Sequence, residues 1–438
     1  MSEKEQSTYR FTSHKSKRVS ARFDAGSLSS DGGLLLLREA DRRLGLTKAA
    51  SKRLVDDRQP GKIKHSAEQL LRQRVYGLAS GYEDLNDFDA LRDDPLWQML
   101  AGGDKPLGGG STLCRFENAQ DRSGAVALNK LFVDQFLDSF QQAPERIVLD
   151  FDATDDPVHG MQEGRFFHGY YGNYCFLPLY VFCGSQLLVA YLRPSNIDAA
   201  KHAGAILKLL TTYIRQRWPQ VQIVFRADSG FCRHRVLGGC ERNQVDYVVG
   251  IARNPRLQRA GAELRYLQGQ VAEDFERTGE KQKRFGQFTY AAGKWKRSRR
   301  IIHKAEHTKL GANPRFVITN VSEAPEQVYA HYCERGEMEN KIKEQMMLFS
   351  DRTSASNWWA NQWRVLLSSL AYVLMDMIRR VGLQGTKLER ATVHSIRVKL
   401  VKIAWLIERK RSRWLFRLSA ACPYQQAFAV CAAKLRPT

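Results

Sequence analysis

The chain has 438 residues, of which 43% are hydrophobic and 26% are charged, as in ordinary globular proteins of two or three domains. The sequence contains no run of about 18 apolar residues, which is the length needed to cross a membrane. The N-terminus lacks a secretory apolar stretch, so the expected compartment is the cytoplasm. The 68 Lys and Arg outnumber the 46 Asp and Glu, and this net charge of +22 favours nucleic acid as a polyanionic partner.

The N-terminal part of the sequence predicts a basic arm followed by helices. Residues 1–25 are polar and basic and could rest on phosphates, although such arms are more often simply solvated. From 26 to 143 apolar residues recur at helical spacing, and Ser66 with Gln69 forms a capping box. We expect an all-α N-terminal domain that binds DNA, although it contains no specific helix-turn-helix signature.

Strands and helices alternate from residue 146 onward. Residues 146–152, 174–182 and 186–192 read as strands, and the last two have hairpin spacing. A helix, a strand ending at Asp228, a short helix and a strand at 246–251 follow. The order of three strands, helix, strand, helix and strand predicts an α/β ribonuclease-H-like fold.

The remainder of the chain completes the predicted domain organisation. A basic, glycine-punctuated stretch interrupts the alternation and predicts an inserted β-rich subdomain. A strand, a long helix over 325–348 and a nearly all-apolar helix over 354–380 come next. The expected parts are a basic flexible arm at 1–25, a helical N-terminal domain at 26–143, the α/β domain at 144–252 and 314–380, the insertion at 253–313, and a helical basic C-terminal region at 381–438.

Four carboxylates follow the first predicted strand, in VLDFDATDDPVHG at 148–160. Alternate strand residues share a face, so Asp150 and Asp152 point the same way, and Asp152 lies nearer the strand end. Asp155 and Asp156 precede a proline, where a turn is expected, and Asp155 is the better candidate for a supporting contact.

Two further acidic residues come from other elements. Asp228 ends a hydrophobic strand before Ser-Gly, and this strand neighbours the first one in the predicted fold, so Asp152 and Asp228 should meet. In the predicted helix that follows, Tyr332, Arg335, Glu339 and Lys343 fall on one stripe. Converging carboxylates of this kind can hold two Mg²⁺ ions about 3.5–4 Å apart for phosphoryl transfer.

These motifs resemble those of the DDE transposases of bacterial insertion sequences, and most closely the thirteen-eighty family, whose catalytic region is the transposase DDE domain group 1. The resemblance runs over nearly the whole chain, through SSDGGLLLLREADRRLGL, LDFDATDDPVHGMQEGRFFHGYYGNYCFLPLYVF, RADSGF and YCERGEMEN. It implies that Asp152, Asp228 and Glu339 are catalytic and bind two Mg²⁺ ions, with Mn²⁺ as a substitute.

The resemblance also suggests DNA contacts. Tyr332, Arg335 and Glu339 match the family's Y-(2)-R-(3)-E-(6)-K signature, but position 346 is methionine, so Lys343 is the candidate replacement for the final lysine. Tyr332, Arg335 and Lys343 would hold the transposon-end backbone or a flipped nucleotide.

Two further sets of residues are weighed against simpler roles. Trp295, beside Lys296 and Arg297 in the basic insertion, is a candidate to stack on an extruded base, with a purely structural tryptophan as the alternative. His159 and His168 are interpreted as structural or DNA-facing, since Mg²⁺ prefers oxygen ligands.

The expected function is cut-and-paste transposition by a bacterial, nucleoid-associated enzyme. The protein would bind terminal inverted repeats and target DNA, cleave with Mg²⁺-activated water, and act as a homodimer. The alternatives are a structure-specific nuclease or resolvase on the same fold, and a DNA-binding regulator with a degenerate catalytic domain.

Overall fold

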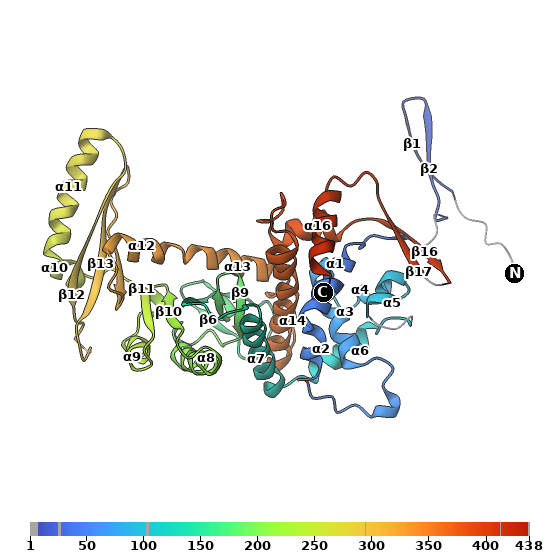
Figure 1. The fold of residues 1–438 in the computed structure, drawn as a ribbon, viewed down its shortest axis with the longest axis horizontal. Coiled ribbons are helices and arrows are strands. Elements are labelled where there is room, and N and C mark those ends of the chain that lie inside the picture. Colours follow the sequence, from blue (N-terminus) through green and yellow to red (C-terminus); the bar gives the residue numbers. More distant parts are fainter. Residues whose placement is uncertain (1–7, 25–27, 102–104, 294, 412, 437–438) are drawn as a thin grey trace. The chain divides into compact units, whose positions relative to one another are not determined.

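The computed structural model describes residues 8–24, 28–101, 105–293, 295–411 and 413–436 (Figure 1). The chain forms two compact units. The first combines residues 1–47, 58–116 and 377–438, and the second combines residues 48–57 and 117–376. Within the described segments, no helix is both long and apolar enough to pass through a membrane.

The first unit contains helices, as expected, but also strands. The helices of this part of the chain are α1 (Leu34–Leu44), α2 (Leu46–Ser51), α3 (Ala67–Ser80), α4 (Asp87–Ala90), α5 (Pro95–Ala101), α6 (Gly110–Asn118), α15 (Val393–Ile396) and α16 (Gln425–Leu435), with π-helical turns η3 (Ile378–Gly382) and η4 (Arg397–Val401). The capping box at the start of α3 is confirmed, since the Gln69 amide donates to Ser66 Oγ and the Ser66 amide donates to Gln69 Oε1.

This unit contains two hairpins, where the sequence predicts a flexible arm at 1–25 and a helical C-terminal region at 381–438. Most of the basic arm forms the hairpin β1 (Tyr9–His14) and β2 (Lys17–Ala21). The C-terminal region contains β16 (Trp405–Lys410) and β17 (Arg413–Leu418), which pair with each other, and β16 also pairs with β3 (Leu28–Ser29). The physical reason is alternation: Trp405 and Ile407 are buried on one face of β16.

The second unit is built on a mixed sheet with the strand order β12-β13-β15-β11-β10-β4-β8-β9. The bounds of these strands are β4 (Arg146–Ala153), β8 (Leu179–Cys183), β9 (Gln186–Tyr191), β10 (Gln222–Ala227), β11 (Asp246–Ile251), β12 (Gln282–Tyr290), β13 (Arg299–Thr308) and β15 (Arg315–Thr319), and β14 (Gly311–Ala312) pairs with β13. Strands β4, β10 and β11 are parallel, and β8 is antiparallel to β4. The prediction that the first and fourth strands are neighbours is confirmed, because β4 pairs with β10.

Different helices cover the two faces of this sheet. The helices of the unit are α7 (Arg122–Asp138), α8 (Ala203–Arg217), α9 (His234–Arg242), α10 (Pro255–Ala260), α11 (Ala262–Thr278), α12 (Pro325–Cys333), α13 (Gly336–Met346) and α14 (Trp358–Met377). Ile147, Leu149 and Phe151 of β4 point into the larger core, which α7, α8 and α9 complete. Val148 points to the opposite face with Val328 of α12, and Figure 1 shows α12 on the other side of β10 and β11 from α8 and α9. Strand alternation therefore places Asp150 and Asp152 on the α12 face.

The stretch 253–313 is not predominantly β. Helices α10 and α11 occupy its first half, and β12 and β13 extend the main sheet rather than forming a separate one. Leu264 and Val271 are buried and Leu267 is partly buried in the main core, which is the spacing of a helix that packs on a sheet. The basic composition of the stretch obscured this pattern.

Two other predicted elements are divided in the structure. The strand expected at 174–182 is split at Pro178 into β7 (Asn173–Phe176) and β8, because proline has no amide hydrogen to donate to a ladder. Strand β7 instead pairs with β5 (Asp156–Pro157) and β6 (Phe166–His168). The helix expected over 325–348 is broken between α12 and α13, at Glu334 and Arg335.

Candidate active site

Asp152 lies at the end of β4, on the face that α13 covers. Its side chain is buried, and its Oδ2 accepts a hydrogen bond from Arg335 Nη1 at 3.3 Å. Burial, then the negative charge of Asp228 and, more weakly, that of Glu339 raise the pKa of Asp152 to about 7, against the opposing charge of Arg335. The structure thus brings the charges of Asp228 and Glu339 within electrostatic reach of Asp152.

Asp228 directly follows β10. Its Oδ1 accepts a hydrogen bond from the Gly230 amide at 2.9 Å, which caps the short turn η2 (Ser229–Phe231). The cap of the next helix, α9, is a different residue, Arg233. Asp228 therefore caps only the turn between strand and helix, and this cap holds the carboxylate at the strand end.

Arg335 connects the first aspartate with the glutamate. It sits at the break between α12 and α13, and its Nη2 donates to Glu339 Oε1 at 2.7 Å while Nη1 faces Asp152. The Glu339 side chain is 52% exposed, so it lies at the rim of the site. Lys343, one turn further along α13, is also exposed.

Tyr332 approaches the same site from the end of α12. Burial raises its pKa, the charge of Arg335 opposes this, and the charge of Asp228 adds to it. A Cβ atom built on Gly250 of β11 would lie 2.5 Å from Tyr332 Oη, so the glycine makes room for this ring. The residues Asp152, Asp228, Glu339, Arg335 and Tyr332 therefore come together.

The donor set suits Mg²⁺ but is not a finished three-carboxylate cage. Among the residues that the structure describes, no three His, Cys, Asp or Glu side chains form a group that could hold one metal ion. Glu339 instead points to Arg335. Mg²⁺ is usually held by one or two carboxylates together with waters and substrate phosphates. The negative charge of Asp228 helps to raise the pKa of the buried Asp152, so a cation between the two carboxylates would be stabilised by their oxygen atoms.

Asp150 forms a buried ion pair and is therefore not part of the candidate metal site. Arg226 Nε and Nη2 donate to Asp150 Oδ1 and Oδ2 at 2.5 and 2.8 Å, and both side chains are buried. Arg226 Nη1 also donates to the His331 carbonyl at 2.6 Å and to Glu334 Oε2 at 2.8 Å. Asp150 thus ties β4 through β10 to α12.

Asp155 and Asp156 have different environments. Asp156 does not lie in an exposed turn: it belongs to β5, is buried, and accepts a hydrogen bond from Thr353 Oγ1 at 2.8 Å. Burial raises the pKa of Asp156 to about 7. Asp155 Oδ2 accepts a hydrogen bond from Asn173 Nδ2 at 3.3 Å.

Tyr171 is a residue of the site that the sequence did not reveal. It lies in the turn between β6 and β7, where burial and the negative charges of Asp155, Asp152 and, more weakly, Asp228 raise its pKa to about 12. Its ring lies 4.8 Å from that of His168, whereas His159 is exposed. In the sequence, the signal for this placement is the density of aromatic residues in RFFHGYYGNYCF. The position of the turn beside the site depends on strand pairing, which a local sequence pattern does not encode.

The structure does not bring Trp295, Lys296 and Arg297 to the carboxylates. They connect β12 with the start of β13, where Arg300 pairs with Thr319 and Thr319 pairs with Val248, near the N-terminal end of β11. Asp152 and Asp228 lie at the opposite, C-terminal ends of parallel strands. Trp295 is partly buried, with its ring 5.6 Å from Tyr290 and 5.0 Å from the guanidinium of Arg299.

Two aspartates at the ends of adjacent parallel strands, facing a glutamate on a helix, define a candidate metal-dependent phosphoryl-transfer site. The transposase DDE domain group 1 family matches residues 11–438, so the chain belongs to that family of transposases. A search of curated proteins finds no match to the sequence.

Proposed function

We propose that this transposase binds the terminal inverted repeats of its own insertion sequence and performs cut-and-paste transposition. The observation that carries the proposal is the convergence of Asp152 and Asp228, with Glu339 linked to Asp152 through Arg335. Membership of the thirteen-eighty family within the DDE group is part of the proposal.

The catalytic region is proposed to be ribonuclease-H-like. The strand order β9-β8-β4-β10-β11 supports this assignment, because β8 is antiparallel to both of its neighbours, β9 and β4, while β4, β10 and β11 are parallel. Ligands of open α/β sheets bind beyond the carboxyl ends of the strands, which is where Asp152 and Asp228 lie. The domain boundaries at 144–252 and 314–380 remain part of the same proposal.

Asp152, Asp228 and Glu339 would hold two Mg²⁺ ions, which Mn²⁺ could replace. When bound, the ions would supply an activated water and stabilise the leaving oxygen. Arg335 forms ion pairs with Asp152 and Glu339. A guanidinium also binds phosphate through parallel hydrogen bonds, so Arg335 can exchange its carboxylate partners for a DNA phosphate. Tyr332 and Lys343 are proposed to contact the same strand.

The net charge of +22 supports DNA as the partner. The N-terminal helices, Trp295 with Lys296 and Arg297, and the basic C-terminal region are the proposed sites for inverted repeats and target DNA. Because Trp295 lies at the opposite end of the sheet from the carboxylates, it would contact a different part of the DNA or act in a homodimer, which we propose as the active form.

The test is to substitute each carboxylate and measure binding and cleavage separately. Asp152→Ala, Asp228→Ala and Glu339→Ala should each bind transposon ends as the wild type does and lose Mg²⁺-dependent cleavage. Glu337→Ala is the matched control, because Glu337 is an exposed carboxylate on the same helix. Normal cleavage by any of the three variants would remove that residue from the site. Joining of pre-cut ends to target DNA separates a transposase from a nuclease or resolvase.

A further inference from the structure

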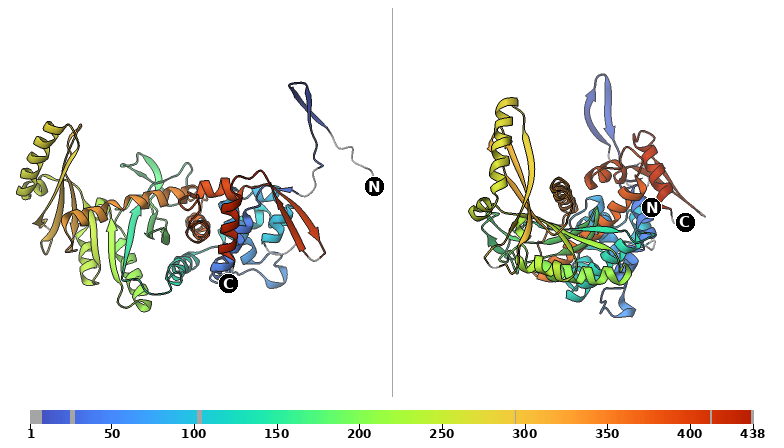
Figure 2. Two further views of the ribbon diagram at one scale, coloured as in Figure 1. Left: turned by 45° about the horizontal axis from the view of Figure 1, so that its top comes forward. Right: turned by 60° about the vertical axis from the view of Figure 1, so that its left-hand side comes forward.

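The hairpin of β6 and β7 exposes an unusual number of aromatic side chains. Phe167 is 57% exposed, Tyr170 is 87% exposed and Tyr174 is 49% exposed. Large apolar side chains that gather on a surface mark a binding site more often than they are tolerated without use. In the left-hand view of Figure 2, the green segment that contains this hairpin stands out from the main sheet.

The exposure does not come from a loosely attached loop. The Val158 amide donates to the Tyr174 carbonyl at 2.9 Å, and Ser195 Oγ donates to the Phe166 carbonyl at 2.8 Å. The Glu163 amide donates to the Ser356 carbonyl at 3.2 Å. The hairpin is therefore fixed to the body of the second unit while its aromatic rings remain in solvent.

The two faces of the hairpin differ. Phe167 is opposite Tyr174 and His168 is opposite Asn173, so strand alternation places these pairs on opposite faces. The face with Asn173 is directed to the carboxylates, because Asn173 donates to Asp155. The other face carries an aromatic ladder, in which the rings of Phe167 and Tyr174 are 5.6 Å apart and nearly perpendicular.

Arg165 and two tyrosines at the turn of the hairpin lie near these rings. The guanidinium of Arg165 lies 4.4 Å from the centre of the Tyr174 ring. At the turn, Tyr170 packs edge-to-face on Tyr171 with 5.0 Å between ring centres, and Tyr171 lies within electrostatic reach of Asp155 and Asp152. The hairpin thus carries two aromatic pairs, Phe167 with Tyr174 on its outer face and Tyr170 with Tyr171 at its turn.

We propose that Arg165, Phe167, Tyr170 and Tyr174 form a stacking platform for unpaired nucleobases of the DNA strand whose phosphate enters the carboxylate site. The proposal rests on the proposed function. Every base offers a flat face to an aromatic ring, and a guanidinium adds attraction to both base and phosphate. The positive charge of the protein favours this polyanionic occupant over a neutral or basic protein surface. The platform would keep the strands apart next to the bond that is cut.

The experiment compares single-stranded with duplex DNA in the absence of metal. The probe is an oligothymidine with one 2-aminopurine, alone or annealed to its complement, and the readouts are fluorescence quenching and the dissociation constant. For the double variant Phe167→Ala/Tyr170→Ala, quenching should disappear and single-strand affinity should fall by about tenfold or more, given the usual contribution of each stacked base. Duplex affinity should change by less than about twofold.

Two further variants control for lost folding and for general loss of exposed rings. Phe167→Tyr/Tyr170→Phe keeps both rings and should retain quenching. Tyr266→Ala removes a 68% exposed tyrosine from α11 and should behave as the wild type. Unchanged quenching in the double alanine variant, or an equal loss on single-stranded and duplex DNA, would overturn the proposal. Loss of a dimer on gel filtration, with normal quenching, would assign the surface to a second copy of the chain instead.

Failure of the platform can be distinguished from failure of the proposed function. Asp152→Asn should quench the probe normally although it does not cleave. If the wild type quenches but cleaves no transposon end, the transposase mechanism is wrong and the platform stands. If the double alanine variant quenches and cleaves like the wild type, the platform alone is wrong.

Discussion

Two carboxylates on one strand show how environment separates structural from chemical residues. Asp150 and Asp152 share a face of β4. Asp150 forms a buried ion pair with Arg226, whereas Asp152 lies within electrostatic reach of Asp228 and forms a longer ion pair with Arg335. A buried charge with a bidentate partner is part of the scaffold, while repelling carboxylates at a strand end cost stability and are retained for chemistry. The distinction depends on the identity of the residue opposite, here Arg226 across the β4–β10 ladder.

Removing Asp150 should therefore destabilise the protein far more than removing the charge of Asp152. We expect Asp150→Ala to lower the free energy of unfolding of the second unit by about 3–5 kcal/mol, because Arg226 stays buried without its partner. Asp152→Asn should leave it unchanged or higher. Chemical denaturation at pH 7.5 provides the measurement, and Asp150→Ala/Arg226→Met should recover most of the loss. Equal stability of the two single variants would contradict these roles.

Asp156 should make stability depend on pH. Its pKa is about 7 in the folded protein against about 4 in the unfolded chain. The folded state therefore holds the proton more tightly, and this contribution is complete below pH 4 and is lost as the pH rises through 7. The loss is at most about 4 kcal/mol. Asp156→Asn keeps an acceptor for Thr353 and should reduce the decline in unfolding free energy between pH 5 and pH 8, whereas Asp155→Asn should not. Asp152, whose pKa is also about 7, contributes to the same decline, so Asp152→Asn/Asp156→Asn should flatten it further. A decline that is undiminished in Asp156→Asn would assign it to other groups.

At the scale of elements, the sequence was sufficient to predict where β4 and β10 end and that they are neighbours. It was not sufficient to predict the short hairpin through which the chain returns to the site. The alternation in β4 and β10 is local, so the meeting of Asp152 with Asp228 followed from strand order. The hairpin that carries Tyr171 depends on pairing of β5 with β7, and two-residue strands leave no periodic signal. The break at Arg335 was not predicted either, because apolar periodicity continues through it. In the structure, α12 ends and α13 begins where Gly336 follows Arg335 and Arg335 donates a hydrogen bond to Asp152.

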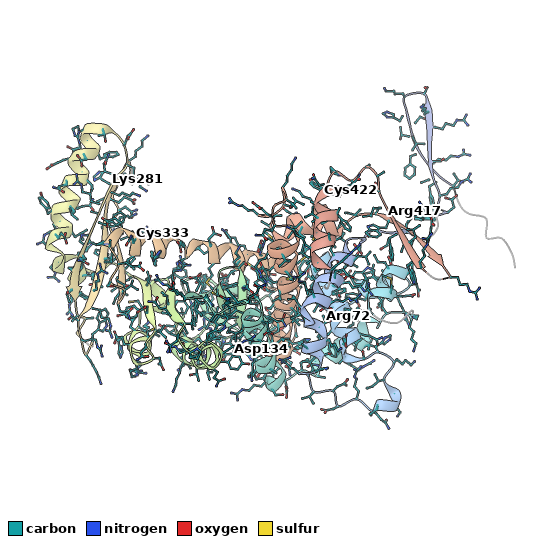
Figure 3. All side chains as sticks on the ribbon, viewed as in Figure 1. Arg72, Asp134, Lys281, Cys333, Arg417 and Cys422 are labelled. Atoms are coloured by element: carbon teal, nitrogen blue, oxygen red, sulfur yellow. The ribbon has the colours of Figure 1, made fainter. Side chains whose placement is uncertain are left out.

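Basic composition was a poor guide to secondary structure. Lys304 and Glu306 of β13 are buried and form an ion pair at 2.7 Å, and Lys281 adds a second pair with Glu306 at 2.8 Å. Burial alone would raise the pKa of Glu306, but hydrogen bonds from Lys281, Lys304 and Asn313 lower it to about 2. Figure 3 labels Lys281, close to where α11 and β12 meet. In the sequence alone, lysines that form buried ion pairs in β13 cannot be told from lysines on a surface that binds DNA.

The contact between β11 and α12 tests whether an element positions the site. Gly250→Ala would place Cβ 2.5 Å from Tyr332 Oη and 3.1 Å from the Ser229 amide nitrogen. The ring and the turn after Asp228 must shift, and a displacement near 1 Å at a catalytic site can cost up to about 100-fold in rate. We expect a cleavage rate lowered by at least about tenfold with end binding retained.

The matched control for this prediction removes the atom that clashes. In a Tyr332→Phe background, adding Gly250→Ala should cost less than it does alone, since the hydroxyl is gone and the variants are coupled. The measurement is the cleavage rate of all four proteins under single-turnover conditions. Independent, additive effects would show that Gly250 does not act through Tyr332.

At the scale of the whole molecule, the excess of positive charge should appear as a strong dependence of DNA binding on salt. Each phosphate that a cation neutralises releases condensed counterions, so the logarithm of the affinity falls linearly with the logarithm of salt concentration. We expect Lys296→Ala to reduce this slope by about one if Lys296 contacts a phosphate of a transposon end. Arg277→Ala is the control, because Arg277 is exposed on α11 and paired with Asp274 at 2.7 Å. The slopes come from dissociation constants measured between about 50 and 200 mM KCl. If both variants lower the slope equally, the charge acts through the general field of the protein, and Lys296 is not a specific phosphate contact.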